Sequence, residues 1–530
     1  MLIFGKKIKF SRIIWFFFYL LVFVILFKNS YSYLDPDLGW HLKAGEHISL
    51  TGEVSRENFY NYTFSGDWVN HEWLIDWLSF EIYTNLNYLV LSILFALVIV
   101  VFLIFLNIYT RRLVGAAASL PIAIFQLLGL YACLPHFGVR MQELSVLFLF
   151  LELIIINDFR SRADKRVLVW LIPLFLVWVN IHGSFLFGLS ILFFWILIEL
   201  SQKLLSRIRK INGYLESSKL LSKDLLIASW FLILAVGATL VNPYGASLYA
   251  FLGEYKNTAY LGLIAEWLPL YAFPIGYLKL IYLGLLSAAW LLYLYEVVRR
   301  KEIKLNWWQF SLFILFLILA FKSERNFPLA LAATFPFFIH ILVNLFNWEA
   351  IKKAGSNIKI RGLLVLCLSL SIISLAISVP YQKQPFIGFC GQFPCQAVKF
   401  LHDNREYDDY KIFNDYNWGG YLIWVYPERQ LFIDGRLPQA PFAGKTFIEE
   451  YKEFFKKDVD KAAKFAQYDI RLALLPAKDK PLNIKKWEKI FFRISDEDLK
   501  VNNYLRDYLN SAADWEKIYE DGTALIYFKN

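Results

Sequence analysis

The chain has 530 residues and a net charge of +10, with 58% hydrophobic and 18% aromatic residues. Its mean hydropathy of +0.44 exceeds what a soluble core requires, so the composition predicts that much of the chain lies in lipid. The positive charge lacks the clustered basic and aromatic pattern that grips nucleic acid, which excludes nucleic acid as an expected partner.

Apolar runs follow one another along the chain. About eleven of them approach the ~20 residues that a helix needs to cross the hydrocarbon of a bilayer. They lie at approximately 13–28, 88–109, 113–134, 142–157, 167–180, 184–203, 225–241, 277–297, 306–321, 327–346 and 362–379. The first run follows a basic start, but no small-residue cleavage pattern comes after it, so we expect a retained helix and not a secretion signal.

Lysine and arginine are concentrated in every second loop. They precede the first run and recur at Arg111-Arg112, 160–166, 203–223, 299–304 and 352–361. The positive-inside rule therefore places the N-terminus in the cytoplasm. An odd number of spans then places the polar tail from about residue 380 outside the membrane. In an oxidising compartment, Cys390 and Cys395 of this tail are expected to form a disulfide, whereas Cys133 and Cys367 are expected to be packing residues.

The outer loop at 29–87 contains an acidic turn, Asp35-Pro36-Asp37. Pro36 disfavours helical geometry at Asp35, so both carboxylates should project from a turn just outside the lipid. Such a pair can share a divalent cation, or supply a base whose pKa is raised by its neighbour's charge. The alternative is a solvated helix end. Ionisable groups at the mouth of a membrane cavity tend to mark function, which favours the first interpretation.

His71-Glu72 lies in an aromatic frame later in the same loop. No second histidine follows four residues later, so a thermolysin-like protease is not expected. Metal binding by Asp35, Asp37, His71 and Glu72 together remains open, because the sequence does not show whether they converge in space.

Several motifs carry a resemblance to known proteins. The stretches DPDLGWHLKAGEHI (35–48) and NYTFSGDWVNHEWL (61–74) are similar to a group of bacterial multi-pass proteins related to the GT-C superfamily of membrane glycosyltransferases. The likeness extends to NIHGSFLFG (180–188), NPYG (242–245), EW (266–267), RNFPL (325–329), NDYNWGGYLIW (414–424) and FIDGR (432–436), and so covers nearly the whole chain. It implies a bacterial inner-membrane enzyme that uses polyprenyl-phosphate-linked sugars.

In the superfamily that this chain resembles, the acidic residue after the first helix acts as general base or assists acceptor binding. Asp35 and Asp37 occupy that place, and Asp35 is slightly preferred. The leaving polyprenyl phosphate would be bound by cationic side chains. Three such residues lie at the outer ends of predicted spans: Arg140, Lys322 and Arg325. Snorkelling to the interface is the alternative role for them. His182, in a tight outer turn, is a fourth candidate for donor binding, and local hydrogen bonding is the simpler alternative role for it.

The tail alternates short β-rich runs with helical stretches, which predicts a small α/β domain with a partly parallel sheet. Strands are expected at YKIFND, RQLFIDG, IRLALLP and TALIYFK, and helices at 394–404, around Tyr421 and at 445–468. If the first two strands are parallel neighbours, their outgoing loops form one polar cluster of Asp415, Asn417, Asp434 and Arg436. This cluster could contact carbohydrate or acceptor, or it could be a loop-stabilising network. Phosphate-binding glycine loops are absent, which disfavours nucleotide-sugar chemistry.

Together these features predict a polytopic α-helical membrane protein with a C-terminal soluble α/β domain. The expected division is a GT-C-like transmembrane domain at 1–379 and an extracytoplasmic domain at 380–530. The expected activity is transfer of a sugar from a polyprenyl-phosphate donor to a glycan, lipid or protein acceptor outside the membrane. A lipid-linked glycan transporter and a non-catalytic envelope assembly protein are the alternatives. An inverted repeat would favour the transporter, and none is evident.

Overall fold

The computed structural model describes residues 2–3, 6–7, 10–64, 66–115, 118–254, 258–272, 274–300, 302–346, 358–379, 389–479, 484–495 and 503–530. The chain divides into two compact units. Unit 1 comprises Met1–Ser32, Leu89–Gly245 and Gly276–Pro380, and unit 2 comprises Tyr33–Tyr88, Ala246–Ile275 and Tyr381–Asn530. The outer loop after the first helix therefore folds with the C-terminal tail.

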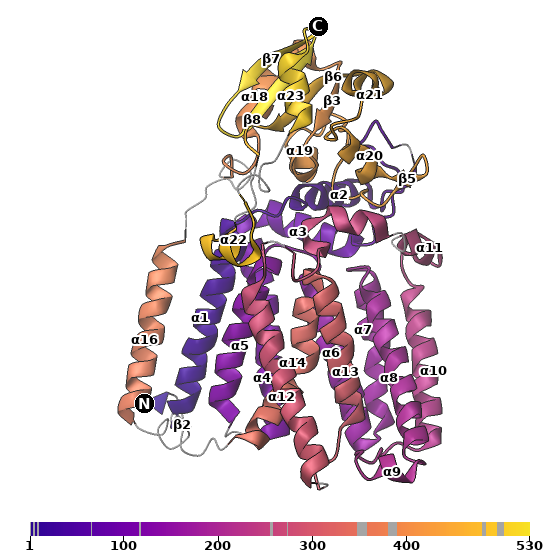
Figure 1. Cartoon of the computed structure of the whole chain (residues 1–530), viewed down its shortest axis with the longest axis vertical. Helices are drawn as coiled ribbons and strands as arrows, with labels where there is room; N and C mark the ends of the chain where they lie inside the picture. Colours follow the sequence, from indigo (N-terminus) through magenta and orange to yellow (C-terminus); the bar gives the residue numbers. More distant parts are fainter. Residues whose placement is uncertain are drawn as a thin grey trace. The chain divides into compact units, whose positions relative to one another are not determined.

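Unit 1 is a bundle of helices that run alongside one another (Figure 1). Its helices are α1 (Phe10–Ser32), α4 (Tyr88–Val114), α5 (Ser119–Cys133), α6 (Glu143–Arg162), α7 (Leu171–Val179), α8 (Phe185–Leu205), α9 (Arg209–Asn212), α10 (Ser222–Thr239), α12 (Tyr277–Arg300), α13 (Trp307–Lys322), α14 (Phe327–Leu345) and α16 (Ile358–Ile377). The first strands, β1 (Leu2–Ile3) and β2 (Lys6–Lys7), pair as a two-residue antiparallel ladder.

Among the described residues, seven helices are long and apolar enough to cross a bilayer: Arg12–Ser32, Tyr88–Val114, Ser119–His136, Phe185–Leu205, Ser222–Thr239, Tyr277–Arg300 and Glu324–Leu345. Two shorter apolar helices span Trp307–Lys322 and Gly362–Ile377. The expected run at 142–157 falls in α6, and the run at 167–180 falls in a 3-10 turn followed by α7. The chain is thus a helical membrane protein with a strand-containing C-terminal part.

Large aromatic side chains fill the interior of unit 1. Trp178, Trp195, Trp290 and Trp308 are all fully buried. The Trp290 ring stacks on Phe313 with centroids 5.1 Å apart and on Phe337 at 5.2 Å. Such offset contacts hold neighbouring helices in a fixed register, since aromatic rings have few rotamers and a directional charge distribution.

Unit 2 contains a four-stranded sheet in the order β3-β6-β8-β7. The strands are β3 (Lys411–Asn414), β6 (Ile470–Pro476), β7 (Trp515–Glu520) and β8 (Ala524–Lys529). The β3–β6 pair is parallel and the β6–β8 and β7–β8 pairs are antiparallel, which confirms a partly parallel sheet. The central strand β6 has the sequence IRLALLP and is buried over most of its length, as expected for a strand covered on both faces.

Helices of unit 2 come from the outer loop and from the tail. Those of the loops are α2 (Leu38–Thr51), α3 (Trp73–Asn85) and α11 (Ser247–Glu254). Those of the tail are α18 (Cys395–Asp403), α19 (Gly419–Val425), α20 (Phe447–Glu453), α21 (Lys461–Tyr468), α22 (Lys486–Phe492) and α23 (Tyr504–Ser511), and the short strands β4 (Pro441–Phe442) and β5 (Lys445–Thr446) form a hairpin beside α20.

Two details of the predicted tail are wrong. The run RQLFIDG does not form a strand of the described sheet, because its Leu431 pairs with the outer loop instead, through an isolated parallel bridge to Asn61. The parallel neighbour of β3 is therefore β6. The helical stretch expected at 445–468 begins with β5 and is divided into α20 and α21, because Asp460 accepts a hydrogen bond from the backbone N–H of Ala463 and starts a new helix.

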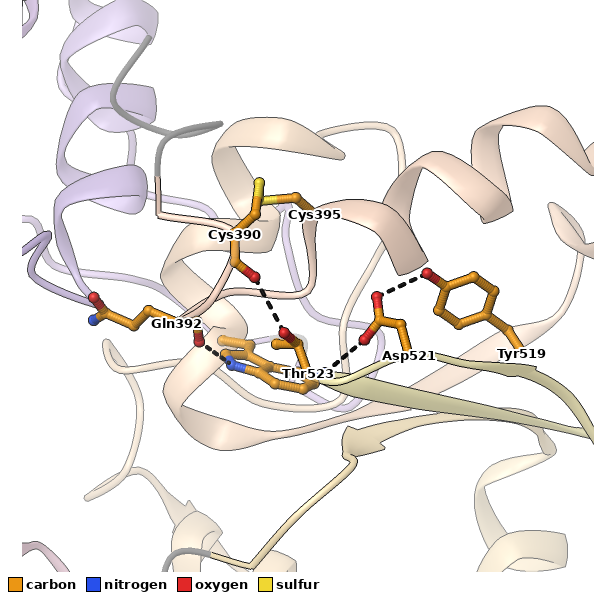
Figure 2. The surroundings of a disulfide bond; sticks show 7 residues. Cys390, Gln392, Cys395, Tyr519, Asp521 and Thr523 are labelled. Atoms are coloured by element: carbon orange, nitrogen blue, oxygen red, sulfur yellow. Dashed lines mark hydrogen bonds between the residues drawn. A yellow bond between two sulfur atoms is a disulfide. The ribbon is translucent and has the colours of Figure 1, made fainter. Parts of the chain in front are cut away.

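The predicted disulfide between Cys390 and Cys395 is confirmed (Figure 2). Thr523 Oγ1 donates to the carbonyl oxygen of Cys390 at 3.1 Å, and Trp418 Nε1 donates to the carbonyl oxygen of Gln392 at 3.2 Å. The disulfide loop is thereby connected to the turn before β8 and to the segment that starts α19. Among the described cysteines, Cys133 is free and buried, and Cys367 is free and exposed.

Candidate functional site

The acidic turn lies between α1 and α2. The helix α1 ends at Ser32, and Asp37 occupies the N-cap position of α2. The backbone N–H of Asp37 donates to Asp35 Oδ1 at 2.9 Å, so the Asp35 carboxylate closes the turn in which it lies. Asp35 is buried and Asp37 is half-buried. The two carboxylates thus have different environments, a distinction that the sequence does not reveal.

Close backbone contacts join this turn to the tail motif of unit 2. A Cβ atom at position 435 would lie 2.1 Å from Asp37 Oδ1, so the Asp37 carboxylate rests directly on Gly435. A Cβ atom on Gly420 would lie 2.3 Å from the carbonyl oxygen of Pro36, and one on Gly39 would lie 2.1 Å from the carbonyl oxygen of Gly420. Gly420 and Gly39 must be glycine because a side chain there would collide with backbone, whereas a side chain at position 435 would displace the Asp37 carboxylate. Motifs almost four hundred residues apart therefore form one structural element.

A buried hydrogen-bonded chain lies on α2 and α3. His41 Nδ1 and Asp76 Oδ1 are 2.6 Å apart, and Asn70 Nδ2 donates to Asp76 Oδ2 at 2.9 Å. The other ring nitrogen, His41 Nε2, lies 3.8 Å from Glu72 Oε2. The close packing of α2 on α3 is permitted by Gly45, where a Cβ atom would lie 2.3 Å from the Asp76 carbonyl oxygen. Asp76 therefore fixes the orientation of the imidazole, and the opposite side of the ring faces Glu72.

Burial alone would lower the pKa of His41, but the charge and hydrogen bond of Asp76, followed by the charges of Glu72 and Asp37, raise this pKa to about 9. Burial raises the pKa of Asp76, and the His41 contact opposes that rise. The upward direction prevails for His41, because three carboxylates act on one imidazole. His41 then carries a positive charge at neutral pH among these acids.

Arg436 is buried inside unit 2, where aromatic rings and polar side chains contact its guanidinium. Its guanidinium lies over the rings of Tyr60 and Trp68, 4.8 and 4.7 Å from the centroids. Nη2 and Nε donate to Asp434 at 2.8 and 2.9 Å, and Nη2 also donates to Asn58 and Asn61 at 2.9 Å each. The Arg436 and Asp434 side chains are 1% and 0% exposed. The loop-stabilising role left open for this pair is therefore supported by its contacts.

Asp415 and Asn417 form a second pair. Asp415 Oδ1 accepts from the backbone N–H of Asn417 at 2.9 Å and from its side chain at 3.2 Å, which caps the 3-10 turn Tyr416–Trp418.

Asn414 connects β3 with the segment 431–434. Its side chain donates to the Ile433 carbonyl oxygen and accepts from the Phe432 N–H, each at 2.9 Å. Asn414 is thus the polar side chain that joins the loop after β3 to the segment preceding Asp434.

His71 lies 4.0 Å from Glu72 through its Nε2 atom, and its ring centroid is 5.8 Å from that of Phe251. Glu72 therefore stands between two histidines, His71 and His41. Within the described part of the chain, no group of three or more His, Cys, Asp or Glu side chains has a geometry that could hold a metal ion. The metal set of Asp35, Asp37, His71 and Glu72, which the sequence left open, is therefore not formed among the described residues.

The four expected donor-binding residues belong to unit 1. Arg140 is half-buried in the turn before α6, and Lys322 is the exposed last residue of α13. Arg325 is half-buried in the turn Glu324–Asn326, where Glu324 forms an ion pair with the buried Lys279. His182 Nδ1 accepts from the backbone N–H of Ser184 at 3.0 Å, a local bond of the kind expected from the simpler interpretation of this turn.

Sequence reasoning missed His41, Asp76 and Asn70 as members of the site, and it missed Gly435 as the support of Asp37. A signal existed for part of this set. His41 lies four residues after Asp37, and Asp76 lies four residues after Glu72, so each pair shares one face of a helix. The contact between Asp37 and Gly435 has no such signal, because it depends on tertiary packing.

No protein-family model and no curated protein matches the chain by sequence. Solved structures do share its fold. The Archaeoglobus fulgidus oligosaccharyltransferase in the apo form superposes with a TM-score of 0.52 at 13% identity, over 89% of this chain and 70% of its own. The same enzyme tethered to an acceptor peptide containing the NVT sequon gives 0.54 at 14%, over 89% and 69%. AglB of this organism, in complex with an inhibitory peptide and a dolichol-phosphate, gives 0.53 at 12%, over 88% and 70%.

These superpositions show that the chain shares its fold with the Archaeoglobus fulgidus oligosaccharyltransferase. At 12–14% identity the likeness establishes the fold alone.

Proposed function

We propose that the chain transfers a sugar from a polyprenyl-phosphate-linked donor to an acceptor outside the membrane. The observation that carries this proposal is the half-buried carboxylate of Asp37, fixed at the start of α2 by Gly435, in a chain with the fold of an oligosaccharyltransferase. The archaeal enzyme was solved with an acceptor peptide and AglB with a dolichol-phosphate, which supports a lipid-linked donor here.

Asp37 is the better candidate for the general base, although sequence reasoning slightly preferred Asp35. The Asp35 carboxylate accepts a backbone hydrogen bond of its own turn and is buried. In the proposed reaction, an acceptor oxygen or nitrogen attacks the anomeric carbon of the sugar and gives its proton to an Asp37 oxygen. The bond from this carbon to the phosphate oxygen breaks, and the phosphate leaves with the electron pair. One base and a stabilised leaving group suffice for inversion.

The buried His41 is proposed to limit the charge of the acidic site. His41 Nε2 lies 3.8 Å from Glu72 Oε2, and the charge of Asp37 is among the causes that raise the pKa of His41. A positive charge among carboxylates offsets part of their mutual repulsion. His71, which lies 4.0 Å from Glu72, is proposed as an outer member of this group.

The leaving phosphate is proposed to meet Arg140, Lys322 and Arg325, with His182 as a further candidate on the donor side. Guanidinium groups match phosphate oxygens in a bidentate geometry, so the two arginines are the stronger candidates. Asp415, Asn417, Asp434 and Arg436 were candidates for acceptor contact. Only Asn417 of these four is exposed, so Asn417 and its partner Asp415 are the more accessible pair.

The described residues include no group of three or more His, Cys, Asp or Glu side chains that could hold a metal ion. A permanently bound metal is therefore not part of the proposed site. Asp35 and Asp37 would be the first candidates for a divalent cation that arrives with the substrate. The proposed proton transfer uses the carboxylate of Asp37 itself.

The membrane topology is proposed to have eleven crossings, with a cytoplasmic N-terminus in the bacterial inner membrane. Unit 2 collects three separate segments, which must lie on one side of the bilayer to form one compact unit. Leaving aside the four-residue helix α9, the described helices between the first two segments are α4, α5, α6, α7, α8 and α10, and those between the last two are α12, α13, α14 and α16. Each set contains an even number of helices. An even number of crossings is required if the three segments of unit 2 lie on the same side of the bilayer. The basic loops fall between these segments, which supports an extracytoplasmic unit 2.

The test is a transfer assay with the purified chain and a panel of radiolabelled polyprenyl-phosphate sugars. Wild type is compared with Asp37→Asn, Asp35→Asn and a matched control, Asp67→Asn, in the same loop at an exposed position. We expect a loss of about 10²–10⁴-fold in Asp37→Asn, the usual contribution of a general base, and no loss in the control. Unchanged transfer in Asp37→Asn would remove the assignment, and donor movement across vesicles without transfer would favour a transporter.

A further inference from the structure

The short helix α22 of unit 2 is labelled in Figure 1. It exposes large apolar side chains. The exposed fractions are 49% for Trp487, 72% for Ile490, 75% for Phe491 and 44% for Phe492. Single exposed apolar residues are ordinary on protein surfaces, but four within one helix form a contiguous patch of the kind that marks an interaction site.

The patch has helical order. Trp487, Ile490 and Phe491 are spaced i, i+3 and i+4, so their side chains lie on one face. On another face, Glu488 is buried and accepts a hydrogen bond from the backbone N–H of Lys485, which fixes the start of the helix. Ile484, just before the helix, is also buried. Glu488 and Ile484 therefore form the buried side of this segment, and Trp487, Ile490 and Phe491 are exposed.

The charges around the patch are positive. Lys485, Lys486 and Arg493 are exposed and Lys489 is half-buried, whereas the acid within the helix, Glu488, is buried. A cationic and aromatic surface of this kind complements the interface of a bilayer that contains anionic phospholipid. The apolar rings enter the acyl boundary there, and lysine and arginine stay among the headgroups.

The connectivity of the chain brings a bilayer to this domain. The chain passes between the two units at 32–33, 88–89, 245–246, 275–276 and 380–381. The first two of these points, 32–33 and 88–89, coincide with the end of α1 and the start of α4. Both helices are apolar enough to span a membrane. Unit 2 is thus tethered within one or two residues of lipid, which favours a membrane surface over a soluble partner.

We propose that α22 is an interfacial anchor that inserts Trp487, Ile490 and Phe491 into the surface of an anionic bilayer. This anchor limits the motion of the C-terminal domain over the membrane. The proposal needs only that the chain spans a membrane, and it is independent of the transfer reaction.

The experiment uses the full chain in nanodiscs, with a nitroxide attached at Phe491→Cys. The background carries Cys133→Ser and Cys367→Ser and keeps the Cys390–Cys395 disulfide. A matched label at Glu516→Cys, exposed on β7 of the same unit, reports a solvent position. Collisions with oxygen, which concentrates in lipid, are compared with collisions with a water-soluble nickel chelate.

In nanodiscs of phosphatidylcholine mixed with phosphatidylglycerol, we expect the label at 491 to shift to oxygen-dominated relaxation, while the label at 516 stays nickel-dominated. Replacing Lys486 and Arg493 with glutamine should reduce this shift, and so should discs of phosphatidylcholine alone. Nickel-dominated relaxation at 491 in both lipids would overturn the proposal. Protection of 491 from both reagents would also overturn it, because the patch would then be covered by protein or by a second copy.

Discussion

His41 Nδ1 and Asp76 Oδ1 lie 2.6 Å apart in the interior of unit 2, and together they connect α2 with α3. This hydrogen bond fixes the imidazole beside Glu72, and it places a positive charge next to the acidic turn that begins α2. The stability of unit 2 and the charge of the candidate site therefore depend on the same pair of residues.

A pH dependence of stability follows from this pair. The pKa of His41 is raised from 6.5 to about 9 in the folded chain, so its contribution is fully present below about pH 6.5 and is lost as the pH rises through about 9. A tenfold change in proton affinity corresponds to about 1.4 kcal/mol of stability. Thermal unfolding followed across this window should show a decline in wild type that is smaller in His41→Gln. The control His47→Gln, on the same helix, should behave as wild type, and equal slopes in all three would contradict the account.

Alanine substitutions of two glycines that contact the acidic turn should have different effects, one on transfer and the other on stability. In Gly435→Ala the added Cβ meets Asp37 Oδ1, the end of a flexible side chain, so the carboxylate turns aside. Transfer should fall strongly with little change in Tm. In Gly420→Ala the Cβ meets the carbonyl oxygen of Pro36, which is backbone, and the free energy of unfolding should fall by about 1–3 kcal/mol.

The matched control for both glycine variants is Gly391→Ala, where a Cβ atom would have nothing within 4 Å. Tm and transfer measured on the same preparations separate the two effects. Equal activity of Gly435→Ala and Gly391→Ala would show that the position of the Asp37 carboxylate is unimportant.

Arg436→Gln should destabilise unit 2, because it leaves the buried Asp434 carboxylate without its partner. Removing one member of a buried ion pair costs about 3–5 kcal/mol. Adding Asp434→Asn should restore part of this loss, since the uncompensated charge is then gone. Lys517→Gln, which breaks an exposed ion pair on β7, should leave the free energy of unfolding unchanged. Chemical denaturation of the four proteins tests the prediction, and a double variant no more stable than Arg436→Gln would refute it.

Local chemistry made much of the fold predictable. Long apolar runs predicted the helices of unit 1, and Pro36 predicted the break after α1. The β-rich runs predicted β3, β6 and β8. Leu431 was misassigned to the sheet because its backbone partner, Asn61, is 370 residues away in the chain, beyond any periodicity. The same limit hid the support of Asp37 by Gly435, although both residues were recognised as parts of motifs.

In the proposed reaction, Asp37 performs proton transfer while cations of the helical unit bind the donor. Donor binding and single-turnover transfer, measured on the same nanodisc preparation, test it most directly. Asp37→Asn should bind the labelled polyprenyl-phosphate sugar as wild type does and fail to transfer it, whereas Arg140→Gln and Arg325→Gln should weaken binding. Full transfer by Asp37→Asn, with binding intact, would contradict the account.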